Sequence, residues 1–266
     1  MKKIISLLLV LVMVLSLAAC GGTAPPLTEP TTAATTPTTE ATQPTTEATE
    51  PAVTVMTHAE FVAAELETPV VIETYVQTIE SWYNDACHIY ALSEDGGYYI
   101  YQDACTKEEA DALVPGTKIR VTGYKGEWAG EVEIMDATIE ILEGSYIATE
   151  PKDVTALLGT DDLAAEMNNL VTFKGLTVVA SNDEGAAFRY KWDGSGSQGD
   201  DLYFKVTDGT NEYTFTVNTY MVGYGAGSEV YAAVEALNVG DVIDVTGFLY
   251  WYEGPQPHLT SVTPAA

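Results

Sequence analysis

Beyond residue 55, apolar and polar positions alternate as they do in β-strands. Ile119 and Val121 alternate with charged or polar neighbours in residues 118–124, and residues 132–142 alternate likewise, with a change of phase near Asp136. A period of two places one face of a strand in a core and leaves the other outside. Such runs predict five strands in each half of this region: 70–79, 87–93, 98–103, 118–124 and 132–142, then 170–179, 202–207, 213–218, 242–249 and 258–262.

The two halves repeat one another in sequence. Residues 115–124 read PGTKIRVTGY and residues 239–248 read VGDVIDVTGF, so that Gly, Ile, Val, Thr and Gly recur at the same spacing. Such self-similarity indicates two copies of one structural unit. The second copy is longer because residues 181–201 form an insertion rich in Gly, Ser and Asp.

Short helices are expected at equivalent places in the two copies. Residues 57–66 and 160–168 precede the first strand of each copy. Between the third and fourth strands, Thr106 and Glu109 form a capping box in the first copy. Residues 228–237 occupy the same place in the second copy and carry their apolar side chains on one face.

The order strand–strand–strand–helix–strand–strand is that of the OB-fold, a five-stranded Greek-key barrel. Residues 116–124, followed by residues 128–134, resemble its fourth and fifth strands. The resemblance covers residues 70–142 and 169–263, and it implies a fold and a habit of binding without an attached activity. Such domains occur in secreted lipoproteins of Gram-positive bacteria. We predict an all-β protein with short helices: two tandem five-stranded OB-type barrels, 56–148 and 149–266, after a disordered stalk.

The first twenty residues have the pattern of a lipoprotein signal peptide. Two lysines precede the apolar residues 4–17, and Leu-Ala-Ala-Cys at 17–20 resembles a lipobox. We predict that acylated Cys20 anchors the protein to the membrane at its extracellular face; the alternatives are an ordinary signal peptide and a short membrane span, for which the apolar run is too short. Residues 21–55, rich in Thr and Pro, have little apolar surface to bury and predict a disordered linker.

Two cysteines, Cys87 and Cys105, lie at the ends of a predicted hairpin. Its turn contains residues 95–97, Asp-Gly-Gly. A two-residue loop would place Cys87 opposite Ala104, and a three-residue loop would place it opposite Cys105. We favour the three-residue loop and predict a disulfide between the two cysteines, since an extracellular location permits one.

The same reasoning sets the register of both hairpins. The three-residue loop puts Leu92 opposite Ile100 in the first copy. In the second copy, Asp-Gly at 208–209 predicts a two-residue turn that pairs Phe204 with Tyr213.

Aromatic residues supply the candidate ligand contacts. OB barrels bind on the face of strands two and three, beside the loops that join strands one to two and four to five. Aromatic rings there can stack on sugars or bases, although they could equally fill the barrels. The candidates are Trp82, Tyr83, Tyr99, Tyr101, Trp128, Trp192, Tyr203, Tyr250 and Trp251.

The net charge of −28 narrows the choice of partner. Phosphate binding needs clustered lysine and arginine, and those of this chain stand among acids, so we do not expect nucleic acid. Binding of a glycan, a peptide or a surface protein to this acidic chain involves less electrostatic repulsion than binding of nucleic acid. Asp193, Asp200 and Asp201 are weak candidates for a calcium site, because their spacing matches no known calcium loop. No cofactor is expected.

No catalytic motif is present. The sequence lacks G-x-S-x-G and a phosphate-binding P-loop, and its three histidines are isolated. Glu131 and Glu133 share a strand face, as many acids do by chance in an acidic chain. We therefore predict a non-catalytic, lipid-anchored binding module of the cell surface, for carbohydrate or peptide. The alternatives are a structural lipoprotein that supports a surface protein complex and, after it, a nucleic-acid-binding OB protein.

Overall fold

The computed structural model describes residues 54–265 of the chain. The predicted signal peptide, Cys20 and residues 21–53 of the predicted linker lie outside the described residues. Within the described range, no helix is long and apolar enough to cross a membrane.

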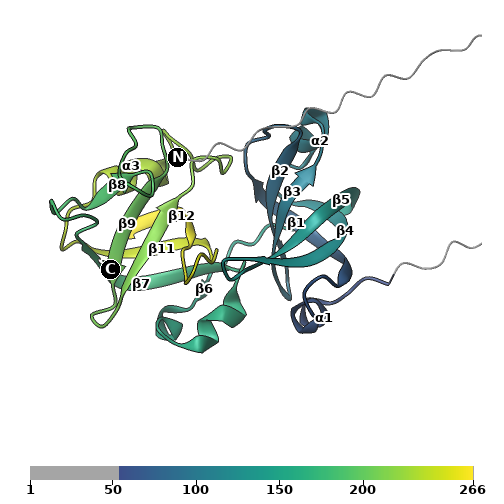
Figure 1. Ribbon diagram of the computed structural model, residues 1–266, viewed down its shortest axis with the longest axis horizontal. Helices are drawn as coiled ribbons and strands as arrows, with labels where there is room; N and C mark the ends of the chain where they lie inside the picture. The colour runs from purple at the N-terminus through teal and green to yellow at the C-terminus, as the bar shows by residue number, and fades with distance from the viewer. Residues whose placement is uncertain (1–53, 266) are drawn as a thin grey trace, which may run out of the picture. The chain divides into compact units, whose positions relative to one another are not determined.

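The first half of the described chain folds into a closed five-stranded barrel (Figure 1). Its elements are α1 (His58–Ala63), β1 (Pro69–Ile79), β2 (Ala86–Ser93), β3 (Gly96–Ala104), α2 (Lys107–Ala112), β4 (Thr117–Trp128) and β5 (Glu131–Ser145). The strand order is β1-β2-β3-β5-β4, and β1 also pairs with β4, which closes the barrel. The pairing of β3 with β5 is parallel and the other pairings are antiparallel.

The second half repeats this topology in a larger sheet. Its elements are β6 (Lys152–Asp153), the 3-10 helices η1 (Thr155–Leu157) and η2 (Asp161–Glu166), β7 (Leu170–Val179), β8 (Phe188–Tyr190), β9 (Leu202–Thr207), β10 (Glu212–Val217), α3 (Glu229–Glu235), β11 (Val242–Phe248) and β12 (His258–Pro264). The sheet order is β6-β7-β11-β12-β10-β9-β8, and an additional pairing of β7 with β9 closes five of these strands into a ring. That ring matches the first barrel strand for strand, and the predicted fold class is confirmed.

Local sequence explains where the elements start. The capping box before α2 forms as predicted: the Thr106 hydroxyl accepts from the Glu109 amide, and the Glu109 carboxylate accepts from the Thr106 amide at 2.7 Å. The strands predicted at 170–179 and 202–207 coincide with β7 and β9. The helix predicted at 160–168 is instead the shorter 3-10 helix η2, whose N-cap residue Thr160 makes no side-chain capping bond.

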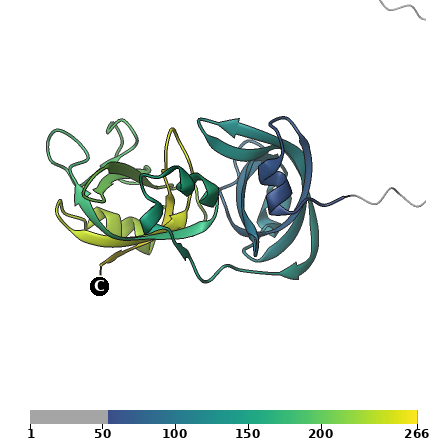
Figure 2. The ribbon, with the colours of Figure 1, turned by 90° about the horizontal axis from the view of Figure 1, so that it is seen from below.

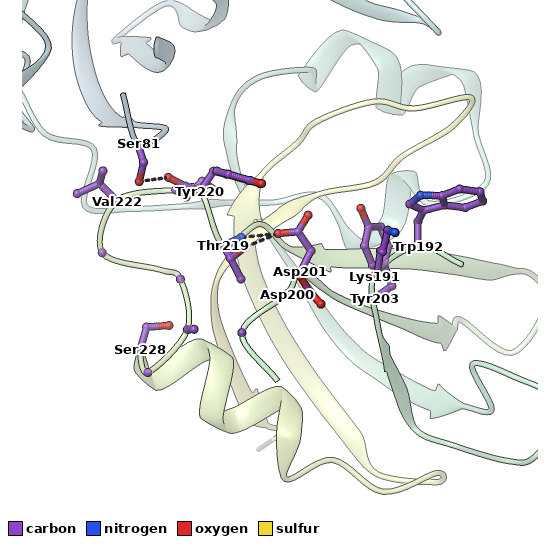
Figure 3. A pocket seen from close by; sticks show the side chains of 16 residues that line it. Ser81, Lys191, Trp192, Asp200, Asp201, Tyr203, Thr219, Tyr220, Val222 and Ser228 are labelled. Atoms are coloured by element: carbon purple, nitrogen blue, oxygen red, sulfur yellow. Dashed lines mark hydrogen bonds between the residues drawn. The ribbon is translucent and has the colours of Figure 1, made fainter. Parts of the chain in front are cut away.

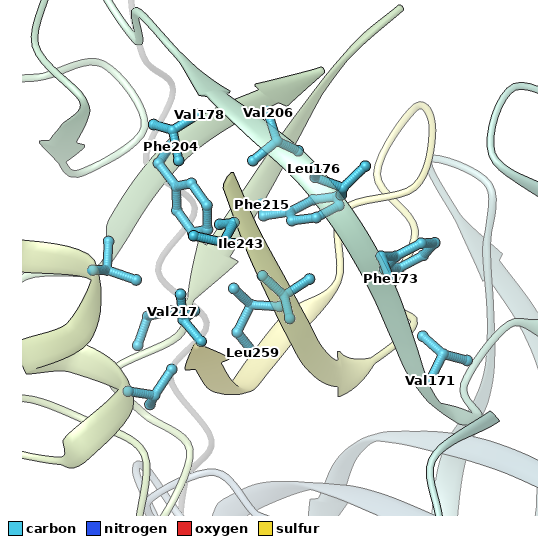
Figure 4. Packing of buried hydrophobic residues seen from close by; sticks show 14 of the residues in the cluster. Val171, Phe173, Leu176, Val178, Phe204, Val206, Phe215, Val217, Ile243 and Leu259 are labelled. Carbon is cyan, nitrogen blue, oxygen red and sulfur yellow. The ribbon is translucent and has the colours of Figure 1, made fainter. Parts of the chain in front are cut away.

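Each barrel encloses its own apolar core, around which its strands curl (Figure 2). Five fully buried isoleucines lie in the first core: Ile72, Ile89, Ile100, Ile119 and Ile134. In the second barrel, Phe173, Phe204 and Phe215 point inward from three strands (Figure 4). Burial of each such side chain stabilises the fold by about 1.5–3 kcal/mol.

The predicted register of the first hairpin is wrong. Ser93 pairs with Gly96 and Leu92 with Gly97, so the turn is Glu94-Asp95 and the two glycines belong to β3. The glycines serve close packing: a Cβ on Gly97 would come within 2.1 Å of the Asn168 carbonyl oxygen. The two glycines therefore mark a close approach between two segments. In the sequence they resemble the glycines of a turn.

The two cysteines nevertheless lie close together. A bulge between Cys87 and Ile89 shifts the pairing, so that Cys87 stands opposite Asp103 and Ala86 opposite Ala104. Both cysteines are buried, and their sulfur atoms are 3.6 Å apart. The disulfide between them stays a prediction, which the position of both sulfurs in the barrel core favours.

The second hairpin also differs from its predicted register. Phe204 pairs with Phe215, and Tyr213 pairs with Val206, so the loop is residues 208–211. The Asp208 carboxylate accepts the amides of the two residues at the end of this loop, each at 2.7 Å. These bonds stabilise a longer loop than Asp-Gly alone predicts. The observed register is shifted by two positions from the predicted one. Because side chains alternate with a period of two, the same face of each strand still points inward.

The two barrels share a third apolar cluster and belong to one compact unit. The cluster contains Tyr90, Leu92 and Tyr99 of the first barrel with Met221 and Phe248 of the second. Backbone bonds reinforce it: the Ser81 amide donates to the Tyr220 carbonyl at 2.7 Å, and the Val222 amide donates to the Ile79 carbonyl at 2.9 Å. The binding faces expected on separate barrels therefore meet.

Candidate binding pocket

A cavity of about 760 Å³ lies where the two barrels meet, and we call it the aromatic pocket. Its aromatic lining comes from both barrels: Tyr99, Tyr101, Trp128, Trp192, Tyr203, Tyr250 and Tyr252. Its polar lining includes Glu80, His88, Glu127, Glu133, Asp201, Thr216, Asn218, Gln256 and His258. No lysine or arginine is among the residues that line it.

Strand alternation explains the contribution of the first barrel. Tyr98 and Ile100 of β3 point into the core, so Tyr99 and Tyr101 point outward. Trp128 ends β4, at the tight turn into β5, and its side chain is 63% exposed. An outward strand face and the loop between strands four and five thus meet at the pocket, as is usual for an OB barrel.

The second barrel contributes mainly through segments that the first barrel lacks. The insertion 181–201 supplies Trp192, 65% exposed, and Asp201. The segment between β11 and β12 supplies Tyr250 and Tyr252. Trp192 and Tyr252 are exposed at the rim, and Tyr250 is half-buried beside a more buried polar floor.

Glu80 is the centre of the polar floor. Its carboxylate accepts from the Tyr90 hydroxyl at 3.0 Å and from the Asn218 side-chain amide at 2.7 Å, and its other oxygen lies 2.9 Å from Nδ1 of His88. Burial acts to raise the pKa of Glu80, but the hydrogen bond and charge of His88, with the other donors, outweigh it and lower the pKa. Glu80 is therefore a fixed carboxylate at neutral pH.

His258 completes the floor from the second barrel. Its ring is stacked on Tyr250, with centroids 4.3 Å apart, and its Nδ1 lies 2.6 Å from the Tyr90 hydroxyl oxygen. Because the hydroxyl gives its one proton to Glu80, His258 donates to the hydroxyl oxygen. Burial lowers the pKa of His258 to about 4, so its ring is neutral at neutral pH.

Two neighbouring acids of β5 behave differently from Glu80. Burial raises the pKa of Glu133, which lines the pocket, to about 7. Burial also raises the pKa of Glu131 to about 8. One oxygen of Glu131 accepts the Trp251 amide at 2.7 Å, and the other has no hydrogen-bond partner among residues 54–265. Glu131 thus joins the barrels as a mainly protonated acid.

Six of the nine predicted ligand residues line the aromatic pocket: Tyr99, Tyr101, Trp128, Trp192, Tyr203 and Tyr250. Trp82 packs against the first core and donates its indole N–H to the Cys105 carbonyl. Trp251 packs against the second core, and Tyr83 is 80% exposed and does not line this pocket.

The sequence prediction missed most of the polar floor. His88 lies on the outward face of β2 with Tyr90, because Cys87 and Ile89 point into the core. Strand alternation could have placed His88 there. Glu80 and His258 come together only through the meeting of the barrels, which the sequence pattern does not reveal.

The acids of residues 193–201 do not converge on a metal. Asp193 accepts from Ser195, Asp200 accepts from the Ser197 amide, and Asp201 accepts from the amide and hydroxyl of Thr219. In the described part of the chain, no group of three or more His, Cys, Asp or Glu side chains could hold a metal ion.

No protein-family model matches the chain, and no curated protein matches it. Similar solved structures include a murine DNA-binding protein bound to double-stranded DNA, 13% identical over 74% of this chain and 100% of that one, with a TM-score of 0.32. The Ifi202 HINa domain in complex with a 20-base-pair double-stranded DNA is 11% identical over 76% of this chain and 98% of that one, with a TM-score of 0.32. The p204 HINb domain is 12% identical over 73% of this chain and 93% of that one, with a TM-score of 0.31.

These structures correct one prediction. Two of them are recorded with double-stranded DNA, which contradicts the expectation from charge that nucleic acid is not a partner, and we withdraw that expectation. Net charge describes a whole chain, whereas binding depends on the potential at one face. Likenesses this distant assign no ligand to this chain.

Proposed function

We propose that the protein is a non-catalytic binding module that holds a carbohydrate in the aromatic pocket. One observation carries the proposal: seven aromatic rings from two barrels converge on one cavity above a hydrogen-bonded polar floor. The volume of about 760 Å³ lies in the usual range for ligand sites, about 300–1,000 Å³.

The chemistry of the lining suits a sugar. Aromatic faces stack on the apolar C–H face of a sugar ring, and Trp128 and Trp192 are exposed at the rim for this purpose. Sugar hydroxyls donate to carboxylates, and Glu80 and Asp201 supply ionisable acceptors within the lining. Glu133, with its pKa near neutrality, can accept as a carboxylate and donate as an acid.

The proposal includes the membrane anchor predicted at Cys20. Its support is the signal pattern of residues 1–20 alone. Labelling of cells with a fatty-acid analogue should mark the wild-type protein, and Cys20→Ser should abolish the label. A wild-type protein without label would remove the anchor from the proposal and leave the pocket unaffected.

A glycan array followed by titration calorimetry tests the pocket. We expect saturable binding of at least one glycan and a loss of about tenfold or more in affinity for Trp128→Ala, since stacking contacts contribute about 1–3 kcal/mol each. Tyr83→Ala removes an exposed ring outside the aromatic pocket and is the matched control.

The same protein is titrated with a 20-base-pair DNA duplex and probed by crosslinking in cells. A silent array would overturn the carbohydrate proposal. Duplex binding sensitive to Trp128→Ala would then assign the pocket to nucleic acid, and a specific crosslinked protein would indicate the assembly role.

A further inference from the structure

A second cavity, of about 950 Å³, adjoins the aromatic pocket, and we call it the side pocket. Trp192, Asp201 and Tyr203 line both cavities. The remainder of the side pocket comes mainly from residues 219–228, with Ser81 of the first barrel. The two cavities therefore adjoin at these three residues, within reach of a single extended ligand.

One of the shared residues, Asp201, is held in place by hydrogen bonds. Asp201 accepts from the Thr219 amide at 2.8 Å and from the Thr219 hydroxyl at 2.6 Å (Figure 3). In the same view, Trp192 and Tyr203 lie on one side of Asp201, and Tyr220 lies on the other. Asp201 is thus fixed at the boundary between the cavities, with aromatic rings on both sides of it.

Tyr220 offers an exposed ring on a fixed backbone. Its carbonyl accepts from the Ser81 amide and hydroxyl, at 2.7 and 3.1 Å, and its amide donates to Asn218. The side chain is 59% exposed and lines the side pocket. Because this backbone is fixed, contact with a ligand has to order only the side-chain torsions of Tyr220.

On the basis of the proposed function, we propose that the ligand is a linear oligosaccharide. It runs from Trp128 in the aromatic pocket, past Trp192 and Tyr203, to Tyr220 in the side pocket. A mono- or disaccharide would contact the rings of one cavity only, whereas a longer chain stacks on both sets at once. The insertion 181–201 matters because it supplies Trp192 and Asp201, where the cavities join.

Calorimetry with oligomers of two, four and six units tests this inference on the full chain. The probes are β-1,4-linked glucose, β-1,4-linked N-acetylglucosamine and β-1,3-linked glucose. For the series that binds, we expect the hexamer to bind at least tenfold more tightly than the dimer. Tyr220→Ala should reduce the hexamer affinity to that of the dimer and leave the dimer affinity unchanged.

Two further variants separate the cavities. Trp128→Ala should weaken dimer and hexamer alike, and Tyr83→Ala should change neither. Thermal unfolding of Tyr220→Ala should match that of the wild type, because the ring is exposed.

Affinity that does not increase with length, or a wild-type hexamer affinity in Tyr220→Ala, would overturn the inference and leave the carbohydrate proposal standing. A lack of binding by all three series would also overturn it. Only a silent glycan array would overturn both.

Discussion

The two barrels share a topology but contribute differently to the pocket. The first supplies an outward strand face and a tight turn, with Tyr99, Tyr101 and Trp128. The second supplies an insertion and a long loop, with Trp192 and Tyr250. The repeated strands therefore build the frame and part of the site, and the segments that are not repeated in the second barrel complete the site. A shared fold says where a site can form, and its differences decide what the site contains.

Aligned positions show the same division inside the cores. Lys125 of the first barrel corresponds to Leu249 of the second, one residue beyond the repeated Gly-aromatic pair. The Lys125 ammonium donates to three carbonyls at the end of α1, those of Phe61, Val62 and Ala64, at 2.8–3.1 Å. Leu249 is fully buried among apolar side chains.

The largest effect is expected from Lys125→Met. It removes the charge that satisfies three carbonyls, and it should lower the free energy of unfolding by up to about 4 kcal/mol. Leu249→Met, the matched change in the second barrel, should cost less than about 1.5 kcal/mol. Urea denaturation measures both, and equal losses would show that the helix end does not depend on Lys125.

The next prediction concerns Cys87 and Cys105, which both lie in the first barrel. If they form the predicted disulfide, reduction should lower stability by about 3 kcal/mol. Thermal unfolding with and without reductant measures the change, with Cys87→Ala/Cys105→Ala as the control that reductant should not affect. Mass spectrometry of unreduced protein would contradict the prediction by finding both residues alkylated.

Tyr90→Phe should have a smaller effect, about 2 kcal/mol. It removes the hydroxyl that joins Glu80 of the first barrel to His258 of the second, and it leaves both partly unsatisfied. Chemical denaturation should show the loss, and Tyr83→Phe should show none. An unchanged Tyr90→Phe would mean that the polar floor contributes nothing to the joining of the barrels.

A further prediction concerns pH. The pKa of Glu131 is raised from 4.5 to about 8 in the folded protein. The stability that Glu131 contributes is therefore complete below pH 4.5 and is lost as pH rises through 8. The loss can reach ~1.4 kcal/mol per pH unit within that window. Glu131→Gln should remain neutral and therefore lose less stability than the wild type between pH 6 and 8. Parallel pH profiles of the two proteins would contradict this.

The stability that His258 contributes depends on pH in the opposite direction. Its pKa is lowered from 6.5 to about 4, so its contribution is complete above pH 6.5 and is lost as pH falls through 4. The acid and the histidine together favour greatest stability near weakly acidic pH. The same pH series, extended downward, examines both groups in one experiment.

Local patterns predicted the strands and capped helices well, because alternation and capping depend on neighbours in sequence. The capping box of Thr106 and Glu109 and the exact bounds of β7 illustrate this. The registers of both hairpins were wrong, because Gly97 responds to a distant backbone and Asp208 organises a longer loop.

The candidate site was only partly predictable for the same reason. Rings such as Tyr99 and Trp128 follow from the usual binding face of one barrel. Glu80 and His258 become neighbours of Tyr90 only when the two barrels meet. Long-range docking of this kind leaves no periodic signal in either copy.

Gly97, which has no side chain, also matters for the pocket. A methyl group there would collide with the backbone at Asn168 and Asn169, so the second half of the protein would have to move away. Neither barrel would need to unfold. An alanine at this position would therefore turn one preassembled pocket into two loosely coupled halves, and a bound molecule would have to bring the halves together.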